Sequence, residues 1–159
     1  MGYDIEIRTI DRTDTAVVHK NVGWAEIAAT LGAIFGDVMT YLTDMGVGTT
    51  GMAFGRYEPQ GETVTIEAGF STAGPIEGDS HVVPGELPGG EVATCVFVGP
   101  YEDVAKVYEA IEGWVAAQGR QIGGAPWESY LSMPDENPPR TEIFFPLAPI
   151  ESTASARGR

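Results

Sequence analysis

Residues 87–115 read LPGGEVATCVFVGPYEDVAKVYEAIEGWV, and this stretch predicts a strand followed directly by a helix. Glu91 to Val98 is mostly apolar and β-branched, which favours a strand. After Gly99-Pro100-Tyr101, apolar residues recur at the three- and four-residue spacing of one helix face: Val104, Val107, Tyr108, Ile111, Trp114 and Val115. Gly119 is predicted to end this helix.

Downstream of this helix, two further strands are predicted. They cover Ala125 to Leu131 and Thr141 to Leu147, and the turn Pro134 to Pro139 separates them. The second half of the chain is therefore predicted to have the element order β-α-β-β.

The first half has the same predicted order. Residues 3–7 and 15–22 are predicted strands, and a helix begins at Gly23-Trp24 and ends at Gly46. A hairpin of residues 52–58 and 63–70 follows. The helix face consists of Ile27, Leu31, Ile34, Val38, Leu42 and Met45. Residues 71–90 are rich in Gly and Pro and predict a crossover, with a short strand around His81 to Val83.

The two halves also align residue by residue. GMAFGRY (Gly51 to Tyr57) lies over GAPWESY (Gly124 to Tyr130), and TVTIEAGF (Thr63 to Phe70) lies over RTEIFFPL (Arg140 to Leu147). Under this alignment Phe54 matches Trp127, Tyr57 matches Tyr130, and Gly55 matches Glu128. The shared order and these matches favour an internal duplication.

The predicted fold class is therefore α+β, with two tandem β-α-β-β modules of the SHS2 type related by a pseudo-two-fold axis. Each module has an antiparallel sheet carrying one long helix. Module one covers 3–70, the linker 71–90 and module two 91–149, together forming a single domain over 1–150. The tail 150–159 is predicted to be disordered. A module alone leaves one surface uncovered, so we expect the modules to pair around a ligand pocket.

Composition narrows the classes of function. The chain has 159 residues, a formal net charge of -14 and nine lysines and arginines, so direct nucleic-acid binding is not expected. Cys95 is the single cysteine, and two isolated histidines give no metal site. No cofactor motif is found. There is no apolar run of membrane-spanning length and no signal-peptide pattern, so we expect a cytoplasmic protein without membrane contact.

The ordered set of motifs resembles the GyrI-like domains, also called bacterial transcription-activator effector-binding domains. The motifs are the Leu-Pro-Gly-Gly of residues 87–90, the Gly-Pro-Tyr of 99–101, Glu128-Ser129-Tyr130, and the closing Thr141-Glu142-Ile143 strand. The resemblance covers roughly residues 3–149. It implies two β-α-β-β modules around a pocket that binds amphipathic molecules, often cationic or aromatic.

The resemblance also implies particular functions. Many members are sensor domains of transcription regulators with a helix-turn-helix, some stand alone, and a subset hydrolyses cyclopropane rings in DNA-alkylating natural products. The acidic pocket residue of the family falls on Glu128. Because residue 3 already begins the sensor fold, direct transcriptional control by this chain is not expected.

Glu128 is also the main candidate site residue when the sequence is considered without the family resemblance. It lies in an otherwise apolar strand, where an unpaired carboxylate is costly or its pKa rises. Such a group suits a cationic ligand, or acid–base chemistry with Tyr130 assisting. The alternative is that Glu128 faces solvent.

Aromatic side chains are the other candidates for ligand contact. Strand alternation puts Tyr130 on the same face as Glu128, and Tyr57 is its counterpart. For Phe54 and Trp127 core packing is favoured over ligand contact, and the same holds for Tyr108 and Trp114. Trp24 and Tyr101 lie at helix starts and could edge the pocket.

Three functions remain open at this point. The favoured one is binding, to sense or sequester a hydrophobic small molecule, cationic or aromatic, such as a multidrug-type ligand. The second is hydrolysis of a cyclopropane-containing alkylator by Glu128. The third is a gyrase-inhibitor-like interaction with a protein partner, for which the sequence offers only its acidic charge.

Overall fold

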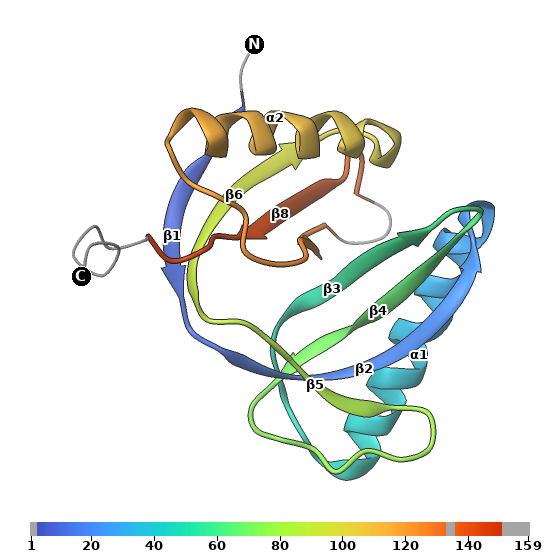
Figure 1. Ribbon diagram of the computed structural model, residues 1–159. Helices are drawn as coiled ribbons and strands as arrows, with labels where there is room; N and C mark the ends of the chain where they lie inside the picture. The colour runs from blue at the N-terminus through green and yellow to red at the C-terminus, as the bar shows by residue number, and fades with distance from the viewer. Residues whose placement is uncertain (1–2, 133–135, 151–159) are drawn as a thin grey trace.

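The computed structural model describes residues 3–132 and 136–150, apart from the side chains at positions 52 and 101. Two α-helices alternate with short runs of strands (Figure 1). The helices are α1 (Ile27–Met45) and α2 (Val104–Ala117), each preceded by a single 3-10 turn. The strands are β1 (Glu6–Ile10), β2 (Thr13–Gly23), β3 (Thr49–Gln60), β4 (Thr63–Thr72), β5 (Val83–Leu87), β6 (Gly90–Val98), β7 (Trp127–Tyr130) and β8 (Arg140–Pro146).

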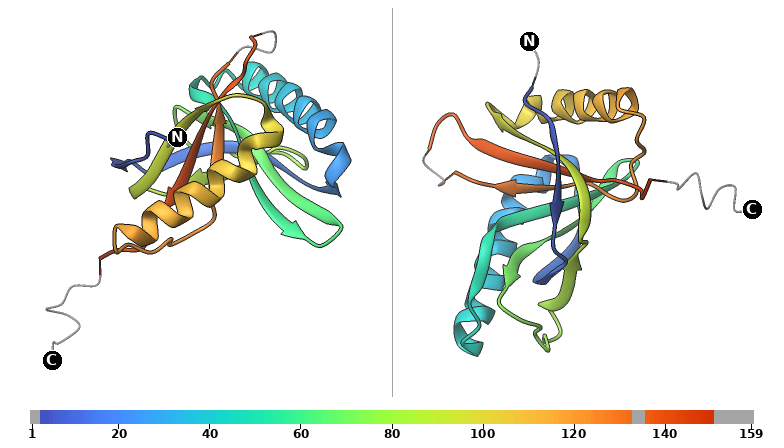
Figure 2. Two further views of the ribbon diagram at one scale, coloured as in Figure 1. Left: turned by 90° about the horizontal axis from the view of Figure 1, so that it is seen from above. Right: turned by 90° about the vertical axis from the view of Figure 1, so that its left-hand side faces the viewer.

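All of these strands belong to one antiparallel sheet. Their order is β1-β6-β8-β7-β3-β4-β2-β5, and the sheet is strongly curled (Figures 1 and 2). The predicted α+β class is confirmed. The two halves of the sheet meet where β3 pairs with β7, through Phe54↔Ser129, Gly55↔Glu128 and Arg56↔Trp127. A two-fold axis passing through the Gly55–Glu128 pair would produce this register.

The two outer strands do not pair within their own stretch of the chain. β1 precedes β2 but pairs with β6, and β5 lies in the crossover but pairs with β2. The strand in the crossover lies later than the predicted His81 to Val83. Pro84 is tolerated inside β5 because the strand is at the sheet edge, where a missing N–H costs little. The edge strand of the second half therefore comes from the first half of the chain, and the edge strand of the first half comes from the crossover.

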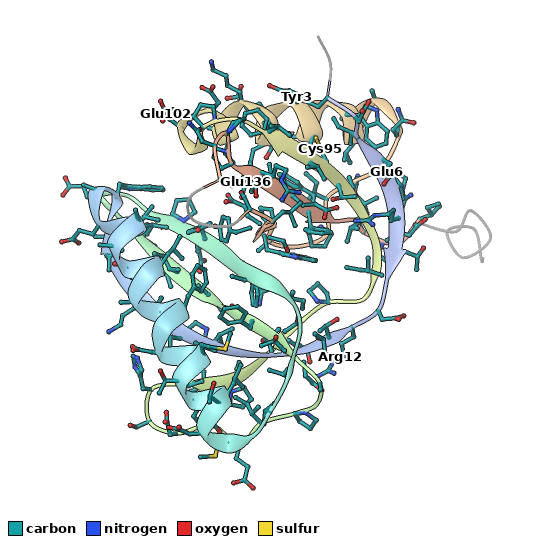
Figure 3. All side chains as sticks on the ribbon, turned by 180° about the vertical axis from the view of Figure 1, so that it is seen from behind. Tyr3, Glu6, Arg12, Cys95, Glu102 and Glu136 are labelled. Carbon is teal, nitrogen blue, oxygen red and sulfur yellow. The ribbon has the colours of Figure 1, made fainter. Side chains whose placement is uncertain are left out.

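Buried side chains gather on both faces of the sheet. On one face, α1 packs on residues of β2 and β4, and α2 packs on residues of β6 and β8. On the other face, a third cluster fills the inside of the curl and consists of Val17, Phe54, Leu87, Val92, Trp127 and Phe144. Strand alternation separates the faces, since Ile143 and Phe145 point to α2 while Phe144 points into the curl. Cys95 lies buried under α2 (Figure 3).

Helix α1 is apolar beyond its buried face. It ends at Gly46, whose φ of 69° allows the left-handed cap that stops a helix. The segment Trp24–Met45 is long and apolar enough to cross a membrane by length and composition, so the expectation that no such run exists was wrong. In the fold this helix packs on the sheet through Ile34, Val38 and Leu42.

The remaining boundaries shift by a few residues from those predicted. β1 starts at Glu6 rather than Tyr3, and α1 is preceded by a 3-10 turn over Trp24–Glu26. Glu26 caps that turn by accepting a hydrogen bond from the Gly23 backbone N–H at 3.0 Å. The predicted turn 134–139 is described from Glu136 onward, and of the predicted disordered tail 150–159 only Ile150 is among the described residues.

Candidate functional site

The junction of β3 and β7 places a glycine opposite a glutamate. Gly55 and Glu128 are direct cross-strand partners at the centre of the sheet. A Cβ atom on residue 55 would lie 2.7 Å from the Tyr57 hydroxyl oxygen and 3.0 Å from that of Tyr130. The missing side chain at Gly55 therefore makes room for two tyrosine hydroxyls beside the carboxylate.

Three tyrosines from three elements converge on Glu128. The Tyr108 hydroxyl, from α2, donates to Oε2 of Glu128 at 2.6 Å, and the Tyr130 hydroxyl, from β7, donates to Oε1 at 3.0 Å. The Tyr57 hydroxyl, from β3, is hydrogen-bonded to that of Tyr130. We call Glu128, Tyr57, Tyr108 and Tyr130 the tyrosine cluster. It joins the two halves of the sheet and α2 through side chains.

Burial dominates the electrostatics of this cluster. Glu128 is 9% exposed, and burial raises the pKa of its carboxyl above the ordinary value, while the hydrogen bonds from Tyr108 and Tyr130 lower it in part. Burial, followed by the nearby Glu128 charge, raises the pKa of Tyr108 and of Tyr130. Both hydroxyls therefore keep their protons and act as donors across the physiological range.

No counter-ion accompanies this acid within the described part of the chain. Among residues 3–132 and 136–150, no lysine, arginine or histidine forms an ion pair with Glu128. An ionised carboxylate held this way retains a net negative charge in a poorly solvated place. A cation that reached it would gain from that charge.

Two other glutamates on strands differ from Glu128 because they form ion pairs. Glu67 and Glu142 lie on the opposite face of the sheet and are half-buried. Glu67 binds Arg56 at 2.9 Å, and Glu142 binds Arg8 at 2.6 Å. The Glu142 side chain is only 17% exposed and is ion-paired. Since both glutamates have arginine partners, neither is a candidate for binding a ligand's charge.

Aromatic rings surround the tyrosine cluster. The Phe35 ring, from α1, lies with its centroid 6.1 Å from that of Tyr130 and 5.7 Å from that of Phe70. On the other side, Tyr108 meets Phe145 edge to face at 5.3 Å. Phe35, Phe70 and the three tyrosines are half-buried rather than fully covered. Their partly exposed faces suit flat apolar molecules and cations.

Two of the predicted aromatic residues lie away from this cluster. Phe54 and Trp127 are 1% and 2% exposed and belong to the core inside the curl, where Trp127 stacks on Phe144 at 5.1 Å. Alternation puts both on the face opposite Glu128. The structure thus places them in the core and not beside the carboxylate, and we leave them out of the site proposed below.

Of the two residues predicted at helix starts, only Trp24 has a described side chain, and its one printed contact lies away from the tyrosine cluster. Trp24 is 47% exposed, and its indole N–H donates to the carbonyl of Gly61 at 2.9 Å, in the turn between β3 and β4. The side chain of Tyr101 lies outside the part of the structure that is described. Of the predicted site residues, Glu128, Tyr130 and Tyr57 are brought together.

Sequence reasoning missed Tyr108, Phe35 and the steric role of Gly55. Tyr108 was expected to be core, because it follows the helix spacing of buried residues. A signal was present nonetheless, since a tyrosine on a buried helix face needs a hydrogen-bond partner for its hydroxyl. Only the packing of α2 over β7 shows that this partner is Glu128.

Two clefts elsewhere were not foreseen. One, of about 660 Å³, lies between the C-terminal half of α1 and the crossover around Pro75 to Val82. The other, of about 310 Å³, lies beside Arg12 and β5. Neither is lined by Glu128. Among the described residues, no group of three or more His, Cys, Asp or Glu side chains is arranged to hold a metal ion.

A family model identifies the family of this chain, and solved structures share its fold. The family model described as "GyrI-like small molecule binding domain" matches residues 3–148. No curated protein sequence matches the chain. The crystal structure of the EcmrR C-terminal domain is similar with a TM-score of 0.79 at 17% identity, covering 94% of this chain and 100% of that one.

Longer and differently named proteins share the fold as well. An EcmrR–DNA complex matches with a TM-score of 0.77 at 17% identity, over 93% of this chain but 58% of the EcmrR chain, so this chain spans little more than half of that protein. SAV2435 bound to tetraphenylphosphonium gives 0.65 at 9% identity, covering 98% of both chains. A structure described as a hydrolase from Listeria innocua gives 0.65 at 14% identity, over 92% and 93%.

Proposed function

Because the chain belongs to the family of GyrI-like small molecule binding domains, we propose that its ligand is a hydrophobic, cationic or aromatic molecule held at the tyrosine cluster. One observation carries the proposal. Glu128 is buried, and among the described residues it has hydroxyl donors but no cation. A charged ligand would supply the missing positive charge, and its binding would offset the cost of burying the carboxylate.

The surroundings of the carboxylate support the same ligand class. Half-buried rings from α1, β3, β4, β7 and α2 offer apolar faces on several sides, and cation–π attraction adds to the attraction of Glu128. The polar atoms beside the carboxylate are tyrosine hydroxyls, which are compatible with ligands of varied shape. The cluster thus favours a lipophilic cation over a strongly hydrated one such as a metal ion.

The proposal is tested by calorimetric titration with tetraphenylphosphonium as a probe. We expect wild-type protein to bind it, and Glu128→Gln to lower the affinity at least about tenfold, or about 1.4 kcal/mol. Glu112→Gln is the matched control, because it removes one negative charge from an exposed position on α2. Equal affinity in the Glu128 and Glu112 variants would reject Glu128 as the charge that binds the ligand.

Hydrolysis of a cyclopropane-containing alkylator is the second candidate function. The observation that favours it is a carboxyl whose pKa burial raises, hydrogen-bonded to two tyrosines, since such an acid can deliver or accept a proton. Product analysis after incubation with a spirocyclopropane compound tests it. Turnover that Glu128→Gln abolishes would support hydrolysis, and stoichiometric binding without product would reject it.

The net charge of the chain bears on its partners in the cell. We propose that the protein acts in the cytoplasm, without direct contact to nucleic acid or membrane, because its charge of -14 is unfavourable near phosphate backbones and anionic lipids. An electrophoretic mobility assay with duplex DNA at low salt tests the first part, and a shift at micromolar protein would reject it.

A further inference from the structure

The larger of the two clefts lies between the end of α1 and the crossover, and Glu128 does not line it (Figure 1). Its volume is about 660 Å³. The α1 wall runs from Asp37 to Met45, which is about 12 Å along the helix axis, and residues 75–82 of the crossover form the opposite wall. The cleft is therefore long enough for about two turns of a helix.

The floor of this cleft is apolar. Its most buried lining residues belong to the buried cluster under α1 or pack against it, namely Tyr41, Val47, Ile76 and Val82. Met45 lies at the edge and is 58% exposed. A methionine side chain is flexible and polarisable, so it adapts to apolar groups of different shapes. The floor and this edge together suit the apolar side of a ligand.

The walls of the cleft are acidic. Both walls carry carboxylates, which are those of Asp37, Asp44, Glu77 and Asp79. Among the described residues that line the cleft there is no lysine or arginine. The smaller cleft differs, because its Arg12 pairs with Asp14 at 3.0 Å and with Glu86 at 2.6 Å. Only the larger cleft therefore combines an apolar floor with a net negative charge.

The acidic groups in the walls are poorly compensated. Asp44 lies in the last turn of α1, where the helix dipole is negative and a basic residue is favoured, yet that turn contains none. Within the described ranges, neither Asp44 nor Glu77 forms an ion pair. Asp79 accepts hydrogen bonds from the backbone N–H groups of Val82 and His81, and these bonds lower the pKa of its carboxyl. A positively charged partner would gain from all three carboxylates.

The crossover wall is held against α1 by hydrogen bonds. The backbone N–H of Gly78 donates to the Tyr41 hydroxyl oxygen at 2.9 Å. Nε2 of His81 is hydrogen-bonded to Oδ2 of Asp37 at 2.8 Å. Because these contacts fix the wall in advance, a ligand has little backbone to order when it binds.

We propose that this cleft docks a basic amphipathic segment of a partner protein, with its apolar side on the floor and its cationic side chains beside the two acidic walls. Charge complementarity decides the occupant. Several lysines or arginines on one backbone engage both walls together, whereas a small monocation engages one carboxylate. A second copy of this chain would bring a further net charge of -14 to the same place.

The test uses the full chain and a fluorescein-labelled amidated peptide, LKKLLKLLKKLLKL, which forms a helix with one leucine face and one lysine face. Fluorescence anisotropy at about 0.15 M salt measures its affinity. We expect saturable binding, with shifts of backbone amide resonances in residues 37–47 and 75–82. The same peptide with glutamate in place of every lysine should not bind.

Two double variants separate the cleft from general attraction to an acidic protein. Asp44→Asn with Glu77→Gln should lower the affinity at least about fivefold, because each substitution removes a cationic partner's contact in the cleft. Glu109→Gln with Glu112→Gln removes the same charge from exposed positions on α2 and should lower it less than about twofold.

A matched pair of methionines tests the apolar contact. Met45→Gln should lower the affinity about threefold, because it replaces the apolar edge of the cleft with a polar side chain of similar size. Met39→Gln should leave the affinity unchanged, since Met39 is also an exposed α1 residue but does not line the cleft. Both positions are exposed, and thermal melting verifies that each variant is folded.

Three outcomes would overturn the proposal. Equal weakening by the two double variants would show that the peptide senses only net charge. Displacement of the peptide by tetraphenylphosphonium would assign the cleft to small lipophilic cations. A dimer of the protein alone that Met45→Gln dissociates, seen by ultracentrifugation, would assign it to a second copy. Glu128→Gln should not change peptide affinity, so a failure here leaves the function proposed for the tyrosine cluster standing.

Discussion

Glutamates on the two faces of the central sheet have different partners. On the face inside the curl, Glu67 and Glu142 each have an arginine within 2.9 Å or less. On the helix face, Glu128 lies between tyrosine hydroxyls, and its side chain has no ion pair within the described residues. The first arrangement neutralises charge and adds to the fold. The second leaves a buried carboxyl without an ion pair among the described residues, which is the basis of the proposal that a cationic ligand binds there.

The largest expected effect concerns the core inside the curl. Trp127→Ala should lower the free energy of unfolding by about 3–5 kcal/mol, because a fully buried ring stacked on Phe144 leaves a cavity. Urea denaturation measures it. A loss below about 1 kcal/mol would mean that the curl is not a packed core, and the contrast between the two faces would fail.

Arg56→Met is expected to have the second-largest effect on the free energy of unfolding. It leaves the half-buried Glu67 without its bidentate partner and should cost about 2 kcal/mol, less than for a fully buried pair because solvent still reaches both side chains. The double variant with Glu67→Gln should recover most of the loss in a double-mutant cycle. Additive losses would show that the pair is not coupled.

Tyr108→Phe probes the other face and should cost about 1.5 kcal/mol at neutral pH. The substitution removes the 2.6 Å hydrogen bond to Glu128 and leaves a buried carboxylate oxygen without this donor. Because the lost bond favours the ionised form, the variant should lose less in acid, where Glu128 is protonated. Chemical denaturation at two pH values checks this, and an equal loss at both would contradict it.

Glu128→Gln is expected to have the smallest effect on the free energy of unfolding, and of these variants it alone should be more stable than wild type. Burial raises the Glu128 pKa, so the folded state binds the proton more tightly than the unfolded state does. The carboxyl's contribution to stability is therefore present below its unfolded pKa and is lost as pH rises through its folded pKa. The variant should gain about 1 kcal/mol at neutral pH.

That gain should shrink toward zero as the pH falls below the unfolded carboxyl range. Denaturation curves of both proteins across pH measure the difference. A variant that is less stable than wild type at neutral pH would mean that the tyrosine hydrogen bonds outweigh the cost of burial, and that Glu128 serves the fold like Glu67 and Glu142.

Much of the local structure could be predicted because it depends on residue spacing. The helix faces of α1 and α2 and the hairpin of β3 and β4 follow from periodicity, and their existence is confirmed within shifts of a few residues. The family was also identified from an ordered set of motifs and is confirmed over residues 3–148. Spacing along one strand likewise put Tyr130 on the side of Glu128.

Contacts between distant segments could not be predicted in this way. The pairing of β1 with β6 and of β5 with β2 depends on which sheet edge each strand meets, and neither strand encodes its partner in its own periodicity. Tyr108 has the spacing of a core residue, and its role depends on α2 crossing over β7. Phe54 and Trp127 could be weighed as ligand contacts until the curl placed them in a closed core.

The sequence by itself therefore determined the α+β class, the order of the elements and the presence of one unexplained glutamate in an apolar strand. Only the tertiary structure decided which glutamates meet arginines and which one meets tyrosines. The physical reason is that alternation assigns a side chain to a face, whereas the partners on that face come from strands and helices far away in the chain. At Glu128 those partners are hydroxyls, and they leave its charge uncompensated.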